Sequence, residues 1–343
     1  MTTNPIPVGV IRWDYLHGGD KHTNCELKSL SPREYHSQVP FFLRIEDEET
    51  VSGHENTQEA IDRQIRYAEQ AGIDYWAFIS GTEEDPEGPE NYAMHKYLAS
   101  GARTSLRFCL VLHKHDKDVW ERRIERLAGL MAQPSYMTAE GGRPLVYVFS
   151  IADMEQAYGA GAGTREALSL IRVKAAAAGL PDPCLVLMCS CARVAHDSGM
   201  AAQYGFDAIS AYSYAGKGPD SLELLPYGDL ACQNRESWNE YLAANLPYIP
   251  LVSFGRNEKP RLLNPPPWGG GHGPYWANPA PEEAAEQLGA GIRFVRAHKD
   301  LCRNGVLCYA WNEYAEGGWI CPTYGEGSAK LEALGKVIRE AAQ

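Results

Sequence analysis

Two glutamates three residues apart are the strongest chemical signal in the sequence. Glu313 and Glu316 lie in CYAWNEYAEGGWICP, residues 308–322. If the chain turns helically there, their Cβ atoms lie about 5–6 Å apart on one face. Two carboxylates that close in a pocket push their pKa values apart, so one carries a proton and the other a charge. Retaining glycosidases use such a pair, although the spacing alone also fits two solvated acids at a helix start.

Aromatic and amide side chains flank this pair in the sequence. Trp311, Tyr314 and Trp319 offer flat apolar faces, against which the C–H faces of a sugar pack well. We therefore predict a carbohydrate site in which Asn312 and Trp319 contact the substrate beside the two glutamates.

Eight apolar runs of strand length alternate with eight segments of helical period. The strands are expected at residues 8–15, 74–79, 105–113, 143–150, 184–190, 208–214, 249–256 and 305–313. The helices are expected at residues 57–71, 91–99, 118–132, 165–178, 193–204, 236–245, 281–298 and 328–342. Most of the strand runs are continuously apolar, as are strands buried on both faces. The alternation predicts a single α/β domain, a (β/α)8 TIM barrel spanning residues 1–343.

The loops indicate which end of the barrel holds the site. A doubly wound open sheet also alternates strands and helices, but LHGGDKHTNC after the first run lacks its G-x-G-x-x-G phosphate loop. The loops that follow predicted strands are long, at residues 16–56, 215–235 and 257–280. Loops this long are uncommon unless they form a binding or catalytic site, and in a barrel the loops that follow the strands lie at the C-terminal face. We expect the site there, with a β-hairpin inserted around residues 38–53.

The composition excludes several classes of function. Thirty-two lysines and arginines stand against 44 aspartates and glutamates, so the formal net charge is −12. That charge repels nucleic acid and anionic membranes, so neither is an expected partner. The sequence opens without a secretory leader pattern and holds no apolar stretch of spanning length, so a cytoplasmic protein is expected. Nothing in the sequence indicates an oligomeric state.

The cysteines and histidines argue against a metal. The nine cysteines are odd in number and often lie in apolar runs, which predicts free thiols. Cys189 and Cys191 lack the second pair that a zinc finger needs. His113 and His115, with Asp116 beside them, leave a metal-dependent hydrolase as an alternative. No other predicted strand end supplies a histidine, so we predict no metal and no cofactor and assign His113 to the sugar.

Further strand-end side chains are expected to line the pocket. Asp14 either bonds a sugar hydroxyl or pairs with Arg12. Trp13 and Trp76 are candidate stacking platforms, although alternation along a strand turns some side chains towards the helices.

The later strands add four candidates. Tyr212 and Tyr214 share one face of the sixth predicted strand, and their place near its end favours the pocket. Arg256 ends the seventh strand, where it either binds an anionic sugar or neutralises one of the two glutamates. Trp276 follows in a glycine-rich segment that we predict to form a flap.

The segment AWNEYAEGGWICP resembles the W-N-E-W-A-E-G-x-x-x-x-P signature of the glycoside hydrolase family 99-like proteins. These include the WbsX-type proteins of polysaccharide gene clusters and, more distantly, the endo-acting α-mannosidases and mannanases of family 99 proper. The layout is also similar at residues 64–78 and 205–214. The matching positions are Trp311, Asn312, Glu313, Ala315, Glu316, Gly317 and Pro322.

The resemblance implies a barrel that cleaves the glycosidic bonds of an oligo- or polysaccharide without a metal. In family 99 proper, the first carboxylate of the motif is a base towards the sugar 2-hydroxyl, which gives a 1,2-anhydro intermediate. The second is the acid, and then the base, at the leaving oxygen. Carried over, the resemblance makes Glu313 the base and Glu316 the acid/base of a retaining-type hydrolase.

The sequence departs from the family pattern in several places. Tyr314 replaces the usual second tryptophan, and Ala315 stands where the mannosidases carry histidine. The segments after the second and third predicted strands also differ from the WbsX-type pattern, so specificity for mannose is not inherited with the fold. A lyase or a glycosyl transferase on the same site, and a non-catalytic glycan-binding barrel, remain alternatives.

Overall fold

Eight parallel strands form a closed barrel in the computed structural model, which describes residues 6–81, 91–219, 221–244, 246–267, 269–302 and 304–343. The strands are β1 (Val8–Arg12), β4 (Tyr75–Ser80), β5 (Arg107–Leu112), β6 (Leu145–Val148), β7 (Cys184–Met188), β8 (Ala208–Ser210), β10 (Leu251–Ser253) and β12 (Val306–Tyr309). Their order is β10-β12-β1-β4-β5-β6-β7-β8. Ile209 closes the ring, because its N–H donates to Pro247 O at 2.8 Å and its carbonyl accepts from Ile249 N at 3.0 Å. The predicted (β/α)8 barrel is confirmed.

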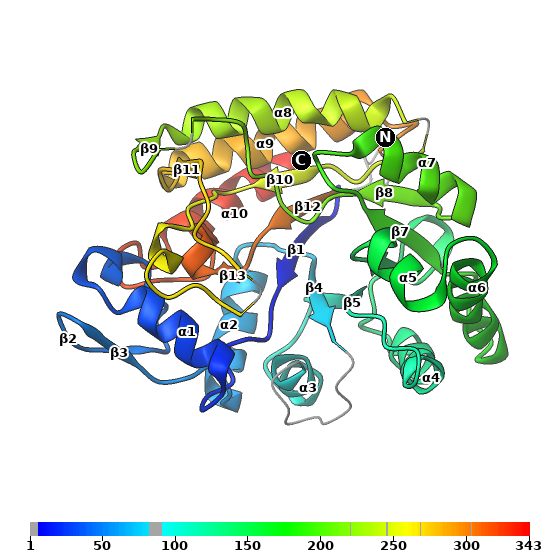
Figure 1. Cartoon of the computed structure of the whole chain (residues 1–343), viewed down its shortest axis with the longest axis horizontal. Coiled ribbons are helices and arrows are strands. Elements are labelled where there is room, and N and C mark those ends of the chain that lie inside the picture. Colours follow the sequence, from blue (N-terminus) through cyan, green and yellow to red (C-terminus); the bar gives the residue numbers. More distant parts are fainter. Residues whose placement is uncertain (1–5, 82–90, 220, 245, 268, 303) are drawn as a thin grey trace.

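Helices surround the barrel, as Figure 1 shows for α8 and α9 along one side and α4 and α6 along another. The eight predicted helices are present as α2 (Gln58–Gln70), α3 (Tyr92–Ala99), α4 (Trp120–Met131), α6 (Ala162–Ala177), α7 (Val194–Tyr204), α8 (Tyr227–Leu242), α9 (Pro281–Ala297) and α10 (Ala329–Ala341). The Thr57 hydroxyl caps α2 by accepting from Ala60 N at 3.1 Å, as its sequence pattern predicts. The prediction for α8 was wrong at its N-terminus, since this helix begins nine residues before residue 236.

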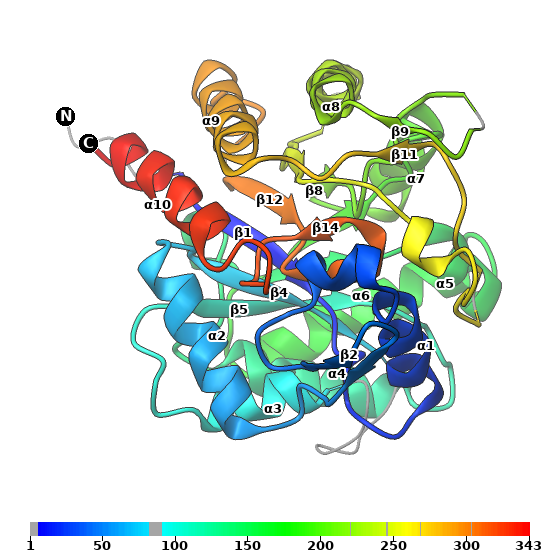
Figure 2. The ribbon, with the colours of Figure 1, turned by 90° about the vertical axis from the view of Figure 1, so that its left-hand side faces the viewer.

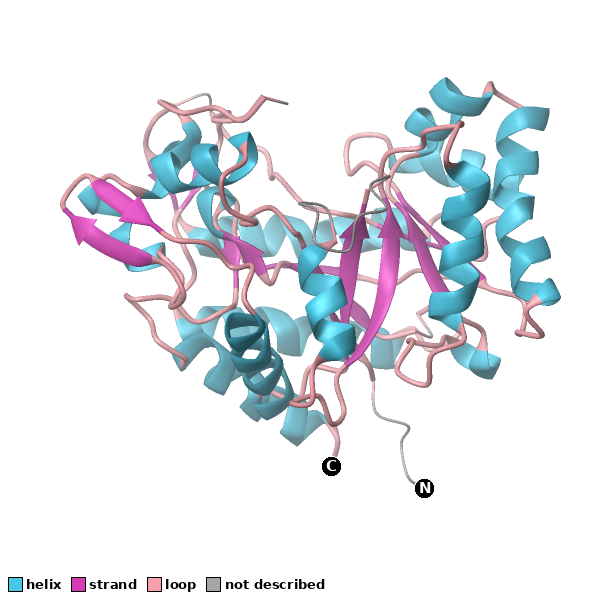
Figure 3. Ribbon diagram, turned by 90° about the horizontal axis from the view of Figure 1, so that it is seen from below, coloured by secondary structure: helices cyan, strands magenta, loops and turns pink. Residues whose placement is uncertain are grey.

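Apart from the hairpin predicted around residues 38–53, the long loops carry structure that the sequence patterns left unassigned. The loop after β1 holds α1 (Lys21–Leu30), the 3₁₀ helix η1 (Arg33–Gln38) and the antiparallel hairpin β2 (Arg44–Asp47)–β3 (Thr50–Ser52), which stands out to one side in Figure 3. Helix α5 (Ile151–Tyr158) follows β6, and the 3₁₀ helix η2 (Glu140–Gly142) precedes β6.

The remaining short elements lie in the loops after β8, β10 and β12. Strand β9 (Leu224–Leu225) pairs with β11 (Tyr275–Trp276), and η3 (Lys259–Arg261) lies between them in the sequence. The loop after β12 contains β13 (Asn312–Glu313), η4 (Tyr314–Glu316) and β14 (Gly318–Trp319). The elements α1, η3 and η4 contact one another, and Figure 2 shows α1 beside the yellow segment that includes η3.

Helix α1 forms because a strong cap precedes it. The Asp20 carboxylate accepts from His22 N at 2.7 Å and from Thr23 N at 3.0 Å. The buried face of the helix includes Thr23, Glu26 and Leu30, spaced three and four residues apart. A glutamate on this buried face requires a polar partner inside the protein.

All nine cysteines are free thiols, as predicted. Among the described residues, no helix combines the length and apolarity needed to cross a membrane.

The interior of the barrel is tightly packed around its first strand. The Tyr75 and Tyr147 hydroxyls lie 3.0 Å apart, and both side chains are fully buried. The Tyr75 ring lies over Gly9, where an added Cβ would come within 2.0 Å of it. Only glycine leaves room for this ring.

We therefore expect Gly9→Ala to lower the free energy of unfolding by about 1–3 kcal/mol, as overpacking does. Gly129→Ala is the control, because Gly129 lies exposed in α4 with no atom within 4 Å of an added Cβ. This second change should leave stability equal or raise it by up to about 1 kcal/mol. Urea unfolding of both variants measures the difference, and equal stabilities would contradict the packing argument.

Candidate active site

The loop after β12 places both glutamates at the barrel mouth. The predicted helical turn is present as η4, and Glu313 and Glu316 are only 3% and 9% exposed. Gly317 ends the turn with φ of 79°, and an added Cβ would lie 2.6 Å from Asn257 N. This close approach lets Asn257 N donate to Glu316 O at 2.6 Å, which fixes the turn against the loop after β10.

Glu316 is surrounded by hydrogen-bond donors. Arg261 Nη1 donates to its Oε1, while Arg256 Nη1 and the Tyr309 hydroxyl both donate to its Oε2. The two arginines come from the loop after β10 and the tyrosine from the end of β12. Donors of this kind stabilise the ionised form of a carboxyl group.

Glu313 has fewer donors. The Tyr212 hydroxyl donates to its Oε1 at 2.8 Å and in turn accepts from Trp13 Nε1. The nearest cation is Arg261, whose Nη2 lies 3.9 Å from Glu313 Oε2. Arg261 thus lies between the two glutamates but bonds closely to Glu316 alone.

Two further glutamates hold the arginines in place. Glu26 Oε2 accepts from Arg261 Nη2 at 3.2 Å, and its Oε1 accepts from Ala315 N at 3.0 Å. Glu258 Oε1 accepts from Arg256, and its Oε2 accepts from Gly271 N at 2.7 Å. Each buried carboxylate therefore orients one guanidinium and one loop.

The surroundings separate the ionisation of the two glutamates. Burial, followed by the charge of Glu316, raises the pKa of Glu313 well above its usual range, and Arg261 and Tyr212 offset only part of this. Burial would also raise the pKa of Glu316, but Arg256, Arg261 and Tyr309 outweigh it and lower that pKa to about 2. The surroundings therefore favour the proton on Glu313 and the charge on Glu316.

Partly exposed aromatic rings form a wall beside Glu313. The rings of Trp13 and His113 pack edge-on with centroids 5.2 Å apart, and His113 packs 4.7 Å from Phe149. Phe149 in turn lies 4.9 Å from Tyr212, and Tyr212 lies 5.2 Å from the buried Tyr309. These rings come from the ends of five strands, so they present apolar surface and polar edges at the mouth. The structure brings Trp13, His113 and Tyr212 together with the glutamates.

Asp14 and Trp76 do not face this site. Asp14 is 6% exposed, accepts from Ala93 N at 2.9 Å at the start of α3 and lies 3.8 Å from Arg12 Nε. Of its two predicted roles, the pairing with Arg12 is the one observed. Burial raises the pKa of Asp14 to about 7, despite the opposing charge of Arg12. Trp76 is fully buried, with its ring centroid 5.0 Å from that of Trp311, because its side chain lies on the face of β4 that packs against the helices.

Asn312 and Trp319 are also buried, and their side chains contact other parts of the protein. Asn312 is fully buried, and its amide accepts from Trp13 N at 3.1 Å and donates to Trp13 O at 2.7 Å, which ties the ends of β1 and β13. Trp319 is 2% exposed beneath Lys330, whose Nζ lies 4.5 Å from the ring centroid. The prediction that they contact substrate does not fit their burial.

The predictions for Tyr214 and Trp276 are corrected in the same way. Tyr214 is 9% exposed, and after burial the groups that raise its pKa are Cys191 and Glu240 of α8, not Glu313. Trp276 is 1% exposed, lies in β11 and donates from Nε1 to Ala215 O at 2.9 Å, so it belongs to a packed strand and not to a flap. Trp268, in the same predicted flap, lies outside the described residues.

The two histidines of the H-x-H segment separate. His113 lies in the aromatic wall, whereas His115 is 6% exposed and packs 5.6 Å from Trp120. Burial, with Arg123 as a second cause, lowers the pKa of His115 to about 3. Among the described residues, no group of three histidine, cysteine, aspartate or glutamate side chains is placed to hold a metal ion.

The sequence patterns missed several residues of the site. Glu26 lies in a helix that they left within a long loop, although Asp20 and Thr23 form a recognisable cap. No sequence pattern marks Arg261 as a residue of the site, because its position depends on a 3₁₀ turn in another long loop. Phe149 lies near the end of a predicted strand and could have been included on that ground, whereas Tyr309 lies in the middle of the strand predicted at residues 305–313, which in the structure ends at this residue.

The fold belongs to a class of (β/α)8 barrels found among glycoside hydrolases. The GH99 endo-α-mannosidase from Bacteroides thetaiotaomicron, in a complex with bis-tris propane, matches with a TM-score of 0.63 and 13% identity over 98% of each chain. A glycoside hydrolase-like protein matches with a TM-score of 0.64 and 13% identity over 98% of this chain and 95% of that one. The resemblance predicted from the motif is confirmed at the level of the fold. No protein-family model and no curated protein matches the sequence.

We expect the contribution of Arg261 to stability to depend on pH. The lowered pKa of Glu316 means that the stabilisation is present above the usual glutamate pKa of about 4.5 and is lost as the pH falls towards about 2. Arg261→Met should therefore lower the free energy of unfolding by about 3–5 kcal/mol at pH 7 and by clearly less at pH 3.

Arg33→Met is the control, because Arg33 pairs with Glu48 on the surface, where both side chains are about three-quarters exposed. It should change stability little at either pH. Chemical unfolding of the wild type and of both variants at each pH gives the change in the free energy of unfolding that each substitution causes. An equal loss for Arg261→Met at pH 7 and pH 3 would show that the network is not ionic.

Proposed function

We propose that the protein is a glycoside hydrolase that acts on an oligo- or polysaccharide with Glu313 and Glu316 as its catalytic pair. The observation that carries this proposal is a pair of buried glutamates at the C-terminal end of a barrel strand, whose different sets of donors shift their pKa values in opposite directions, so that one favours the proton and the other the charge. General acid catalysis needs the first, and stabilisation of a positively charged sugar needs the second. The fold shared with the GH99 endo-α-mannosidase supports the same chemistry.

The donors around the pair favour one assignment of roles. Glu316 has three donors that keep it charged, whereas Glu313 has one hydroxyl at 2.8 Å and a more distant guanidinium. We therefore assign the acid to Glu313 and the charge-stabilising carboxylate to Glu316. This is the reverse of the roles that the resemblance implies, because here the donors, and not the order of the motif, determine where the proton lies.

The reaction follows from this distribution of charge. Glu313 gives its proton to the glycosidic oxygen as the bond from that oxygen to C1 breaks, and the leaving group departs as an alcohol. The ionised Glu316 balances the positive charge that develops at C1. Water then adds at C1 and returns a proton to Glu313, which restores the resting site. Glu313 delivers this water to the face of C1 from which the leaving group has departed, so the configuration at C1 is retained.

The aromatic wall supplies the sugar-binding surface. Trp13 and His113 present partly exposed rings beside the Tyr212 hydroxyl that bonds Glu313. Sugar C–H faces pack on such rings, while their hydroxyls reach the polar edges. The substrate therefore lies against the ends of β1, β5, β6 and β8.

A library of glycans offered to the purified protein tests the activity. We expect turnover by the wild type, and a loss of about 10²–10⁴-fold in Glu313→Gln and Glu316→Gln, since the first amide cannot give the proton and the second lacks the negative charge. Glu286→Gln is the control, because this exposed residue of α9 pairs only with Arg293 among the contacts described. Full activity in both active-site variants would refute the pair. An unsaturated product absorbing in the ultraviolet would indicate a lyase, and binding without turnover would indicate a glycan-binding barrel.

The same variants distinguish the two roles when the leaving group is changed. A dinitrophenyl glycoside of the sugar identified in the library departs without protonation, so it no longer needs the acid. We expect Glu313→Gln to recover most of the wild-type rate on this substrate, whereas Glu316→Gln stays slow. If Glu316→Gln is the variant that recovers, the roles are those that the resemblance implies.

A further inference from the structure

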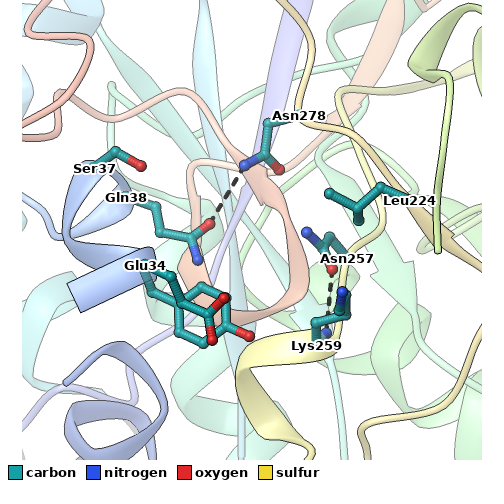
Figure 4. A pocket seen from close by; sticks show the side chains of 8 residues that line it. Glu34, Ser37, Gln38, Leu224, Asn257, Lys259 and Asn278 are labelled. Atoms are coloured by element: carbon teal, nitrogen blue, oxygen red, sulfur yellow. Dashed lines mark hydrogen bonds between the residues drawn. The ribbon is translucent and has the colours of Figure 1, made fainter. Parts of the chain in front are cut away.

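A cavity lies among the loops at the barrel mouth, and neither glutamate of the catalytic pair lines it. It has a volume of about 160 Å³, and three loops line it: η1 after β1, the loop after β8, and the loop after β10 (Figure 4). An enclosed space of about 150 Å³ is enough for one six-membered ring. The cavity therefore has room for one ring-sized ligand.

Three of the eight residues that line it carry amide side chains. Gln38 and Asn257 are 3% and 6% exposed, and Asn278 Nδ2 approaches Gln38 Oε1 at 3.5 Å, as the dashed line in Figure 4 shows. Asn278 Oδ1 is buried and has no hydrogen-bond partner among the described residues. A buried acceptor without a partner favours a ligand that donates a hydrogen bond.

The remaining lining selects a neutral ligand. Glu34 and Lys259 bring opposite charges to the same cavity, so neither an anion nor a cation is preferred. Tyr35 adds an aromatic ring, and amides both donate and accept hydrogen bonds. Hydroxyl groups on a ring with apolar C–H faces satisfy all of these groups at once.

One short segment joins this cavity to the catalytic pair. Arg256 and Arg261 bond to Glu316, whereas Asn257 and Lys259, which lie between them in the sequence, line the cavity. Asn257 N also donates to Glu316 O at 2.6 Å. The cavity thus backs onto the peptide that carries Glu316, while its lining residues do not include either catalytic glutamate.

We propose that this cavity is a binding site for a neutral pyranose unit, distinct from the site of bond cleavage. The choice of a sugar rests on the proposed glycosidase function, while the neutral, hydroxyl-rich character rests on the lining itself. The unit is either a distal residue of the glycan being cleaved or a free sugar. Both present the same ring and hydroxyl groups to the amides.

Ligand-observed nuclear magnetic resonance with the methyl glycosides of glucose, mannose and galactose tests the site. We expect at least one of them to bind the wild type, and to bind about tenfold more weakly to Asn278→Ala and to Tyr35→Ala. Gln133→Ala is the matched control, because Gln133 is exposed between α4 and β6 and does not line the cavity. Thermal unfolding of each variant checks that the fold is intact.

Binding is measured in Glu316→Gln as well, because the proposal expects it to be unchanged there. No binding of any of the three glycosides to the wild type overturns the proposal. Undiminished binding in both cavity variants, or loss of binding in Glu316→Gln alone, overturns it too. If binding is weakened in both cavity variants and unchanged in Glu316→Gln, but no glycan is turned over, the hydrolase is refuted and the pyranose site is retained.

Kinetics on oligosaccharides of increasing length separate the two sources of the sugar. If the cavity holds a distal unit of the substrate, Asn278→Ala raises KM for long substrates and leaves the shortest one unchanged. If it holds a free sugar, KM is independent of length, and added methyl glycoside changes the rate of the wild type but not of the variant.

Discussion

The buried Arg261 guanidinium links three loops at the mouth of the barrel. It bonds Glu316 in the loop after β12 and Glu26 in the loop after β1, while it belongs itself to the loop after β10. A guanidinium at 4% to 5% exposure is costly to desolvate, and only several carboxylates in good geometry offset that cost. The three longest stretches of irregular chain at the barrel mouth therefore have one mutual arrangement that satisfies their charges.

The barrel itself was predictable, because most of its strands are continuous apolar runs and each is followed by a segment of helical period. The motif glutamates were predictable for a different reason: two carboxylates three residues apart, at the end of a strand, have few structural roles. Trp76, Asn312, Trp319 and Trp276 show where that reasoning fails. Each was chosen for its chemical type near a strand end, yet each is at most 2% exposed, and burial is decided by which side of the strand or loop faces the core.

Arg261 and Glu26 could not have been found from the sequence, because their meeting depends on two long loops folding over each other. They are 235 residues apart in the chain. Local patterns predict a helix or a strand from neighbours a few positions away, whereas this contact is fixed only by the closed barrel and by the 3₁₀ turn before Leu262. The distribution of the proton between Glu313 and Glu316 follows from that contact, so it too lies beyond the motif.

The mouth of the barrel divides into two halves that differ in how well they tolerate changes of sequence. On the side of β10, β12 and β1, ion pairs and backbone hydrogen bonds link the loops, so an inserted residue between Arg256 and Arg261 would shift one arginine off Glu316. On the side of β5 and β6, the structure contributes ring faces, His113 and Phe149, to the site. A ring face tolerates replacement by another ring, so new sugar preferences can evolve on that side while the chemistry of the opposite side is kept.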